Sequence, residues 1–216
     1  NEGGGILICN RSVADVFYNA DGTKITDEDG LPVMERRYTQ MENINVLNNV
    51  FAYNDLWVFN IAGPSDGLKF FNNTVLLDGE RQTYLLFSED MANTGVPAKN
   101  WTFSNNIFWQ AKKQTVLFDE AWCQSWTAEN NLFYNFNDTF FDDFNNDYRT
   151  EIATYFTFDP QLSTTEAADG IACAGKIVAR NPQVYTSGRY EDGMMCADIN
   201  GNDAEGIRYL GAVAKV

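Results

Sequence analysis

The chain has 216 residues, which is enough for one domain with a substantial hydrophobic core. Its 30 acidic and 15 basic residues give a formal net charge of −15, which argues against nucleic acid and against an anionic membrane surface as partners. The absence of histidine excludes histidine-based nucleophilic catalysis and histidine-ligated metal sites, and the absence of any run of about 18 apolar residues predicts no membrane span.

The chain begins with an apolar strand that is followed by a long polar insertion. Residues 5–9 are expected to form the strand. Residues 11–41 form the insertion, in which Asn19-Ala20-Asp21-Gly22 and Asp27-Glu28-Asp29-Gly30 are strong turn signals. We therefore expect a hairpin that folds over one side of the domain.

An asparagine pair recurs four times along the chain, each time between short apolar runs. The pairs are Asn48-Asn49, Asn72-Asn73, Asn105-Asn106 and Asn130-Asn131. Successive pairs are 24, 33 and 25 residues apart, and the longest spacing contains a further insertion at residues 91–100. The runs between the pairs are rich in aromatic and β-branched residues, which is typical of strands. About three such runs fall in each period, which predicts a solenoid with three strands per coil.

The asparagine pairs have a structural explanation in such a solenoid. Asparagine tolerates left-handed backbone at a tight turn, and amide side chains that stack in register can hydrogen-bond to one another. We expect each pair to lie at the turn between the second and third strands of a coil. A binding site lined by asparagine is the functional alternative.

The end of the chain departs from the repeat. Residues 1–158 are expected to form the coils, and residues 159–216 an irregular C-terminal cap on them, because an open coil end exposes strand edges and apolar core. No amphipathic segment precedes the first strand. We therefore expect the chain to be part of a longer protein, with the missing N-terminal part as a partner.

Several motifs together carry a family resemblance. They are the strand–Asn-Asn–strand repeat, the Gly3-Gly4-Gly5-Ile6 opening, Asp159-Pro160-Gln161-Leu162, Asn181-Pro182-Gln183-Val184 with Gly188, Asp198-Ile199-Asn200-Gly201 and Leu210-Gly211-Ala212. Over roughly residues 3–10 and 42–213 the chain resembles pectate-lyase-like right-handed parallel β-helix proteins of the type secreted by Bacteroidetes. The resemblance implies an all-β right-handed parallel β-helix that is extracellular, periplasmic or on the cell surface. It leaves the activity open, because such folds host lyases, hydrolases and adhesins.

An acidic group ends two strands that could be neighbours in the stack. It consists of Glu89, Asp90, Asp119 and Glu120. In the family that the chain resembles, ligands lie along the outer face of the first-strand sheet, where these residues are expected. Paired carboxylates can act as acid and base on a glycosidic bond or bind calcium through their oxygens. Solvated strand ends are the alternative without a function.

Basic residues fall in turns beside the same face. They are Arg81, Lys112 and Lys113. Pectate-lyase-like enzymes use a lysine or arginine to remove the proton next to a uronate carboxylate, and cations neutralise that carboxylate. Arg81 and Lys112 are therefore the candidates for base or charge neutraliser, with ordinary exposed cations as the alternative.

Aromatic residues form the third candidate group. The expected carbohydrate-binding residues are Trp57, Tyr84, Trp109 and Trp122. Exposed rings of this kind offer a surface on which sugars stack. Strand alternation leaves open whether Trp57 and Phe59 or Leu56 and Val58 face outward. Packing in the core is the alternative for these rings.

The sequence thus predicts a secreted β-helix protein that acts on or binds polysaccharide. As an enzyme it would be a polysaccharide lyase or a glycoside hydrolase, and a non-catalytic cell-surface adhesin or structural module is the alternative. Calcium is the one candidate cofactor.

Overall fold

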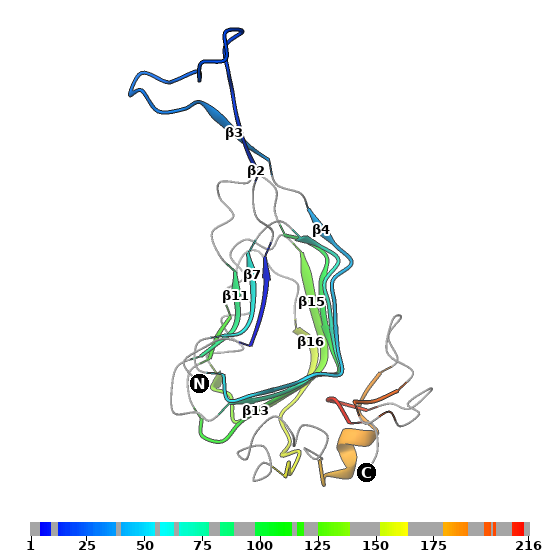
Figure 1. Cartoon of the computed structure of the whole chain (residues 1–216). Helices are drawn as coiled ribbons and strands as arrows, with labels where there is room; N and C mark the ends of the chain where they lie inside the picture. The colour runs from blue at the N-terminus through cyan, green and yellow to red at the C-terminus, as the bar shows by residue number, and fades with distance from the viewer. Residues whose placement is uncertain are drawn as a thin grey trace.

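Parallel β-strands dominate the structure (Figure 1). The computed structural model describes residues 5–9, 13–37, 40–54, 57–62, 65–77, 83–88, 98–113, 116–118, 125–138, 152–163, 179–189, 197–199, 201 and 209–213. Within these ranges the predicted all-β class is confirmed in its coarser form, as a four-stranded and a curled eight-stranded parallel sheet beside two sheets of two short strands each.

The smaller sheet has four parallel strands whose spatial order follows the chain. They are β1 (Ile6–Cys9), β7 (Trp57–Ala62), β11 (Thr83–Ser88) and β14 (Val116–Phe118). Each strand is therefore joined to its neighbour by a stretch of chain that leaves this sheet and then returns to it.

The larger sheet receives those stretches of chain. Its order is β5 (Asn45–Leu47), β9 (Lys69–Phe71), β12 (Trp101–Ser104), β15 (Trp126–Tyr134), β13 (Ile107–Gln110), β10 (Thr74–Leu77) and β6 (Val50–Ala52), and β16 (Ile152–Phe156) also pairs with β15. The first half of β15 pairs with β12 and its second half with β13. We call the side with β5, β9 and β12 the first wing and the side with β6, β10 and β13 the second wing.

One pass of the chain thus contributes a strand to the smaller sheet and a strand to each wing. Successive passes stack in parallel register, as β5, β9, β12 and β15 show in the first wing. Two short strands, β4 (Met41–Glu42) and β8 (Ser65–Asp66), pair in parallel just before the first wing. Figure 1 shows the two sheets as walls around a common interior.

The asparagine pairs lie where the two wings meet, as predicted. The first residue of each pair has a φ of 53° to 57°; these residues are Asn48, Asn72, Asn105 and Asn130. This is left-handed backbone, which asparagine adopts more readily than most residues. The chain therefore turns from the first wing to the second within two residues.

The second residue of each pair joins a ladder of amide side chains. The Oδ1 atom of Asn73 accepts hydrogen bonds from the main-chain N–H and Nδ2 of Asn49 at 2.9 and 3.2 Å. Asn106 accepts in the same way from Asn73 at 2.8 and 3.2 Å, and Asn131 from Asn106 at 3.1 and 2.8 Å. Asn73, Asn106 and Asn131 are fully buried, so the ladder satisfies polar groups that water does not reach. The predicted stacking of amides is confirmed.

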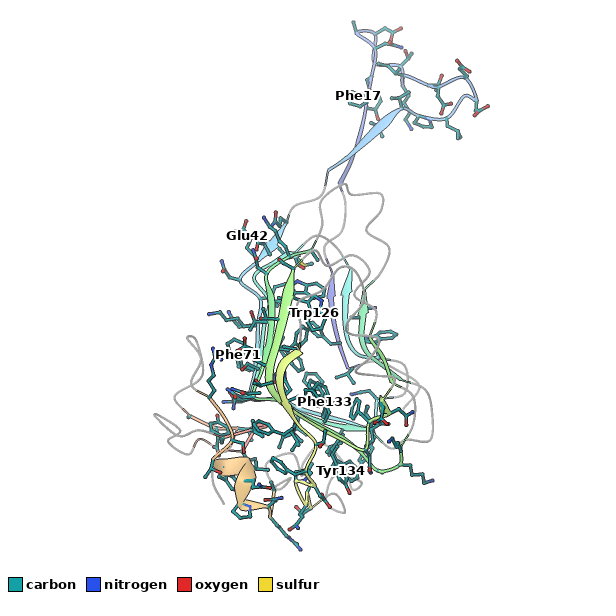
Figure 2. All side chains as sticks on the ribbon, turned by 180° about the vertical axis from the view of Figure 1, so that it is seen from behind. Phe17, Glu42, Phe71, Trp126, Phe133 and Tyr134 are labelled. Atoms are coloured by element: carbon teal, nitrogen blue, oxygen red, sulfur yellow. The ribbon has the colours of Figure 1, made fainter. Side chains whose placement is uncertain are left out.

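Aromatic rings fill the interior between the walls. The ring of Phe70 lies 5.6 to 6.4 Å, centroid to centroid, from the rings of Phe51, Phe59, Phe103 and Phe108. Phe108 stacks in turn on Phe133 at 4.9 Å. Figure 2 shows Trp126 and Phe133 on the interior side of the wings. These large rings bury much apolar surface from few positions, which suits the narrow core of a stack.

The described residues near the C-terminus, 179–189, 197–199 and 209–213, lie along the side of the stack, outside the corner between the wings (Figure 1), and we call them the C-terminal segment. Ala179, Val184 of the short helix η3 (Pro182–Tyr185) and Leu210 pack with Ile107 and Leu132 in an apolar cluster apart from the main core. The outer face of the second wing is therefore covered. The predicted cap contacts several successive passes rather than only the last one.

Hydrogen bonds from the corner asparagines hold these C-terminal residues. The Nδ2 atoms of Asn48 and Asn72 donate to the carbonyls of Ala197 and Tyr209 at 2.7 and 2.9 Å. Asn105 exchanges hydrogen bonds with the main chain of Arg189. The Tyr209 hydroxyl donates to Asn48 Oδ1 at 3.2 Å, and burial raises the pKa of Tyr209 to about 12.

Gly211 is a point at which this contact can be tested. Its φ is +76°, and a Cβ there would lie 2.6 Å from Thr74 Oγ1 and 2.7 Å from Ile107 Cδ1. At Gly22, where φ is +85°, an added Cβ would have no neighbour within 4 Å. Both alanine variants suffer the same backbone strain, so we expect Gly211→Ala to be less stable than Gly22→Ala by about 2 kcal/mol, because only Gly211→Ala also crowds its neighbours. Urea unfolding of the two variants measures the difference, and equal midpoints would contradict the close packing of this segment.

A projecting arm, residues 13–37, occupies the predicted insertion. Its base is an antiparallel pair, β2 (Val13–Val16) and β3 (Met34–Arg37), so the predicted hairpin is confirmed. The arm extends away from the sheets rather than folding over one side (Figure 1). Its turns satisfy their own backbone, since Asp27 Oδ1 accepts from the amides of Asp29 and Leu31. Leu31 is 62% exposed.

Candidate functional site

The three outer faces of the stack differ in what they offer a ligand. The second wing is covered, because Leu76, Trp109 and Leu162 pack together there beside the apolar cluster of the C-terminal segment. The side chains of β1, β11 and β14 lie outside the part that the structure describes in detail. The first wing is the outer face on which described side chains are both polar and partly exposed.

A polar row crosses the first wing. It consists of Asn45, Lys69, Thr102 and Thr127, which are register partners on β5, β9, β12 and β15. Asn45 is exposed and the other three are partly exposed. Neighbouring strands in a sheet lie about 4.8 Å apart, so the row repeats at that interval.

Strand alternation explains why the row faces outward. The next residue on each strand is Val46, Phe70, Phe103 or Ala128, and all four belong to the main core. Because successive side chains of a strand point to opposite faces, the polar row must lie on the outer face. Two residues further along, Phe71 also lies on that face (Figure 2) but is buried, at 3% exposure. The accessible part of the face is therefore the polar row rather than the Phe71 side.

A charged cluster flanks the row at the corner nearer the arm. Lys99 Nζ lies 3.2 Å from Asp66 Oδ2, and Asn100 Nδ2 donates to Asp66 Oδ1 at 2.7 Å. Asn100 also receives a hydrogen bond from the Ser125 hydroxyl, at 3.2 Å. The hydrogen bond from Asn100, assisted by Lys99, lowers the pKa of Asp66. This carboxylate is therefore ionised at neutral pH and serves as a fixed acceptor.

The opposite flank is formed by the C-terminal segment. The guanidinium of Arg189 pairs with the carboxylate of Glu129, which lies on β15 two residues after Thr127. Arg189 is itself anchored through its main chain to Asn105. The polar row therefore lies between two ion pairs, with amide, hydroxyl and ammonium groups that can donate and accept hydrogen bonds.

Metal binding was predicted from an acidic group on another sheet. No group of three or more His, Cys, Asp or Glu side chains able to hold a metal ion occurs within the described ranges. The calcium prediction rests on Glu89, Asp90, Asp119 and Glu120, which lie outside those ranges, and it stays a prediction.

The other predicted catalytic residues are placed only in part. Arg81 lies outside the described residues. Lys112 is exposed in the bend that follows β13, beyond the end of the second wing. The structure thus does not bring Lys112 together with the polar row, which lies on the other wing.

The predicted carbohydrate-binding aromatic residues lie on two different sheets. Trp57 and Tyr84 are register partners on β7 and β11. Val58 and Phe59 both belong to the main core, where Phe59 packs on Phe70, whereas Trp57 at the start of the strand is partly exposed. The Trp57 indole N–H is buried and has no hydrogen-bond partner in the described part of the chain.

Trp109, by contrast, belongs to the second wing. Its ring stacks on Tyr134 with the centroids 6.5 Å apart, and it packs against residues that the C-terminal segment covers. Figure 2 shows Tyr134 on the outer side of this wing. Trp122 lies outside the described residues. The structure therefore does not place Trp57 and Trp109 on one platform.

The polar row is the feature that sequence reasoning missed. Each of its members stands three positions before an asparagine pair, as Asn45 does before Asn48. In each repeat the order along the chain is the row residue, a core residue, one further residue and then the asparagine pair. Aligning the four repeats on their asparagines and marking this shared polar position would have found the row.

Comparisons with other proteins add nothing to these observations: no protein-family model, curated protein or solved structure matches the chain significantly. Where the structure describes the chain, no helix has the length and apolar character needed to cross a bilayer.

Proposed function

We propose that this chain is a right-handed parallel β-helix that binds polysaccharide along the polar row of its first wing. The observation that carries the proposal is the row itself, in which Asn45, Lys69, Thr102 and Thr127 repeat in register on a stacked sheet. A rigid periodic row suits a linear polymer of repeating units, because successive sugars meet similar groups and little ordering is needed on binding. The proposed location is accordingly extracellular, periplasmic or on the cell surface.

The β-helix part of the proposal rests on connectivity. Each pass visits the smaller sheet, the first wing and the second wing before it returns to pair beside its starting strand, as β7 does beside β1. Connections between parallel strands of one sheet are right-handed in about 98% of cases. A right-handed solenoid is therefore the expected arrangement for such a chain.

Lys69 gives the row a positive charge near its centre. The chain as a whole carries −15, so a cation on this face offsets the repulsion that an acidic polymer meets elsewhere. We therefore propose that uronate-containing polysaccharides bind more tightly than neutral ones. Lyase or hydrolase activity stays a prediction from the sequence, because its residues, Lys112 apart, lie outside the described part of the chain.

The proposal is tested with a panel of neutral and uronate polysaccharides in affinity electrophoresis, with reducing-end release measured in parallel with calcium and with chelator. We expect Lys69→Gln to weaken binding of a uronate polymer about fivefold to tenfold, because a charge-assisted hydrogen bond is lost. The matched control is Lys24→Gln on the arm, which is expected to bind as the parent does. Equal effects of both substitutions, or no binding to any polymer, would refute the proposed face.

A further inference from the structure

The asparagine ladder has a direction, and that direction bears on the first pass of the chain. The Oδ1 atom of each inner asparagine accepts from the asparagine of the preceding pass, as Asn106 does from Asn73. Its Nδ2 atom also donates to a main-chain carbonyl of the preceding pass. These bonds run from Asn73 to Val46, from Asn106 to Phe70 and from Asn131 to Phe103, at 2.8 to 3.0 Å.

The pattern breaks at Asn49, in the first pass. Its Nδ2 atom turns back to the carbonyl of Leu47, two residues earlier, at 2.9 Å. In the other three asparagines, Oδ1 accepts from the preceding pass. The Oδ1 atom of Asn49 receives no hydrogen bond from the residues that the structure describes. Asn49 is partly exposed, whereas the three later asparagines are buried. One end of the ladder is therefore open.

The strands of the same pass are the edges of the larger sheet. β5 ends the first wing and β6 ends the second, and each pairs on only one side within the described residues. An unpaired strand edge is a template for a further strand. The open acceptor of Asn49 lies between these two edges, which together define one continuous surface.

We propose that the edge formed by β5, Asn49 and β6 is a docking surface for an extended polypeptide segment with a strand–Asn-Asn–strand pattern, which adds as parallel strands to both wings. The hydrogen bonds of the ladder indicate which groups on the segment would match this edge. The main-chain N–H and the side-chain amide of Asn49 both donate to Asn73 Oδ1, so a segment with an asparagine at the matching position would fill the open acceptor of Asn49 in the same way. The chain's own repeat, with an Asn-Asn turn between two short apolar strands, describes the required chemistry. This is strand addition with one side-chain-specific contact.

The test uses the 216-residue chain and a labelled, acetylated peptide of residues 68–77, which contains one complete strand–Asn-Asn–strand unit. The matched peptide carries alanine in place of Asn73. Fluorescence anisotropy is expected to show that the chain binds the asparagine peptide about fivefold more tightly, which corresponds to one buried hydrogen-bonded amide. The Asn49→Ala chain is expected to bind both peptides equally.

Equal binding of the two peptides by the parent chain would overturn the proposal, as would a preference that persists in Asn49→Ala, since the peptide would then be docking elsewhere. Sedimentation of the chain without peptide measures whether the chain associates with itself through this edge. Self-association that Asn49→Ala abolishes would replace the separate segment with a second copy of the chain. This inference does not rest on the proposed glycan face, because the peptide assay contains no polysaccharide.

Discussion

Replacing Asn106 with alanine is expected to lower the free energy of unfolding by about 3–5 kcal/mol. Asn106 is fully buried and takes part in four hydrogen bonds with neighbouring asparagines, besides one to the carbonyl of Phe70. The substitution removes the acceptor of the buried Asn73 main-chain N–H and the amide donors to Asn131 and to the carbonyl of Phe70. A buried polar group that loses its partner costs about 1–3 kcal/mol. Urea unfolding followed by tryptophan fluorescence measures the loss.

Asn49→Ala is the matched control for Asn106→Ala. The two residues occupy the same position of the repeat, but Asn49 is partly exposed at the open end, and the groups it leaves are nearer to water. We expect a loss of about 1 kcal/mol. If Asn49→Ala proved as damaging as Asn106→Ala, the buried ladder would not be the source of the stability assigned to it.

Phe70→Ala is expected to have a comparably large effect, a loss of about 3–5 kcal/mol. Its ring is 2% exposed and contacts aromatic rings from both wings and from β7, so removal leaves a cavity that several rigid strands border. Because sheets stacked in register cannot easily collapse into the space, little of the loss is recovered.

The control for Phe70→Ala is Phe17→Ala on the arm. Phe17 is 41% exposed, and its substitution is expected to change the free energy of unfolding by no more than about 0.5 kcal/mol. Thermal unfolding of the two variants side by side gives the comparison. A small effect at Phe70 would mean that the rings of the interior do not pack as one core.

The repeat made the strand pattern predictable. An asparagine pair flanked by apolar runs predicts a left-handed turn and a stacked amide, and both are present at Asn105-Asn106. The signal is strong because few residues adopt a positive φ and because a buried amide needs partners that only a stack provides.

The orientation of the smaller sheet could not be derived in the same way. Trp57, Val58 and Phe59 are all apolar, so period-two alternation does not tell the inner face from the outer one. In the structure Val58 and Phe59 both belong to the main core, and the contact between Phe59 and Phe70 joins residues from two different sheets. Tertiary packing of this kind has no signature within a single strand.

The course of the C-terminal residues was likewise not predictable from their composition. A cap over the open end was expected, yet Tyr209 and Leu210 lie along the side of the passes that contain Asn48, Asn72 and Ile107. The partners of the corner asparagines are main-chain carbonyls, which every residue carries, so the sequence does not reveal which ones are used. This placement has a functional consequence, since it closes the second wing and leaves the polar row accessible.

Lysine labelling with and without polysaccharide, read by mass spectrometry, tests the central claim most directly. The chain carries Lys69 in the polar row, Lys24 on the arm and Lys112 beyond β13, so each region of interest has its own reporter. The account predicts that a bound uronate polymer protects Lys69 from acylation and leaves Lys24 and Lys112 as reactive as before. If the polymer protected Lys112 while Lys69 stayed reactive, the account would be contradicted, and the ligand would be assigned to the face of the smaller sheet instead.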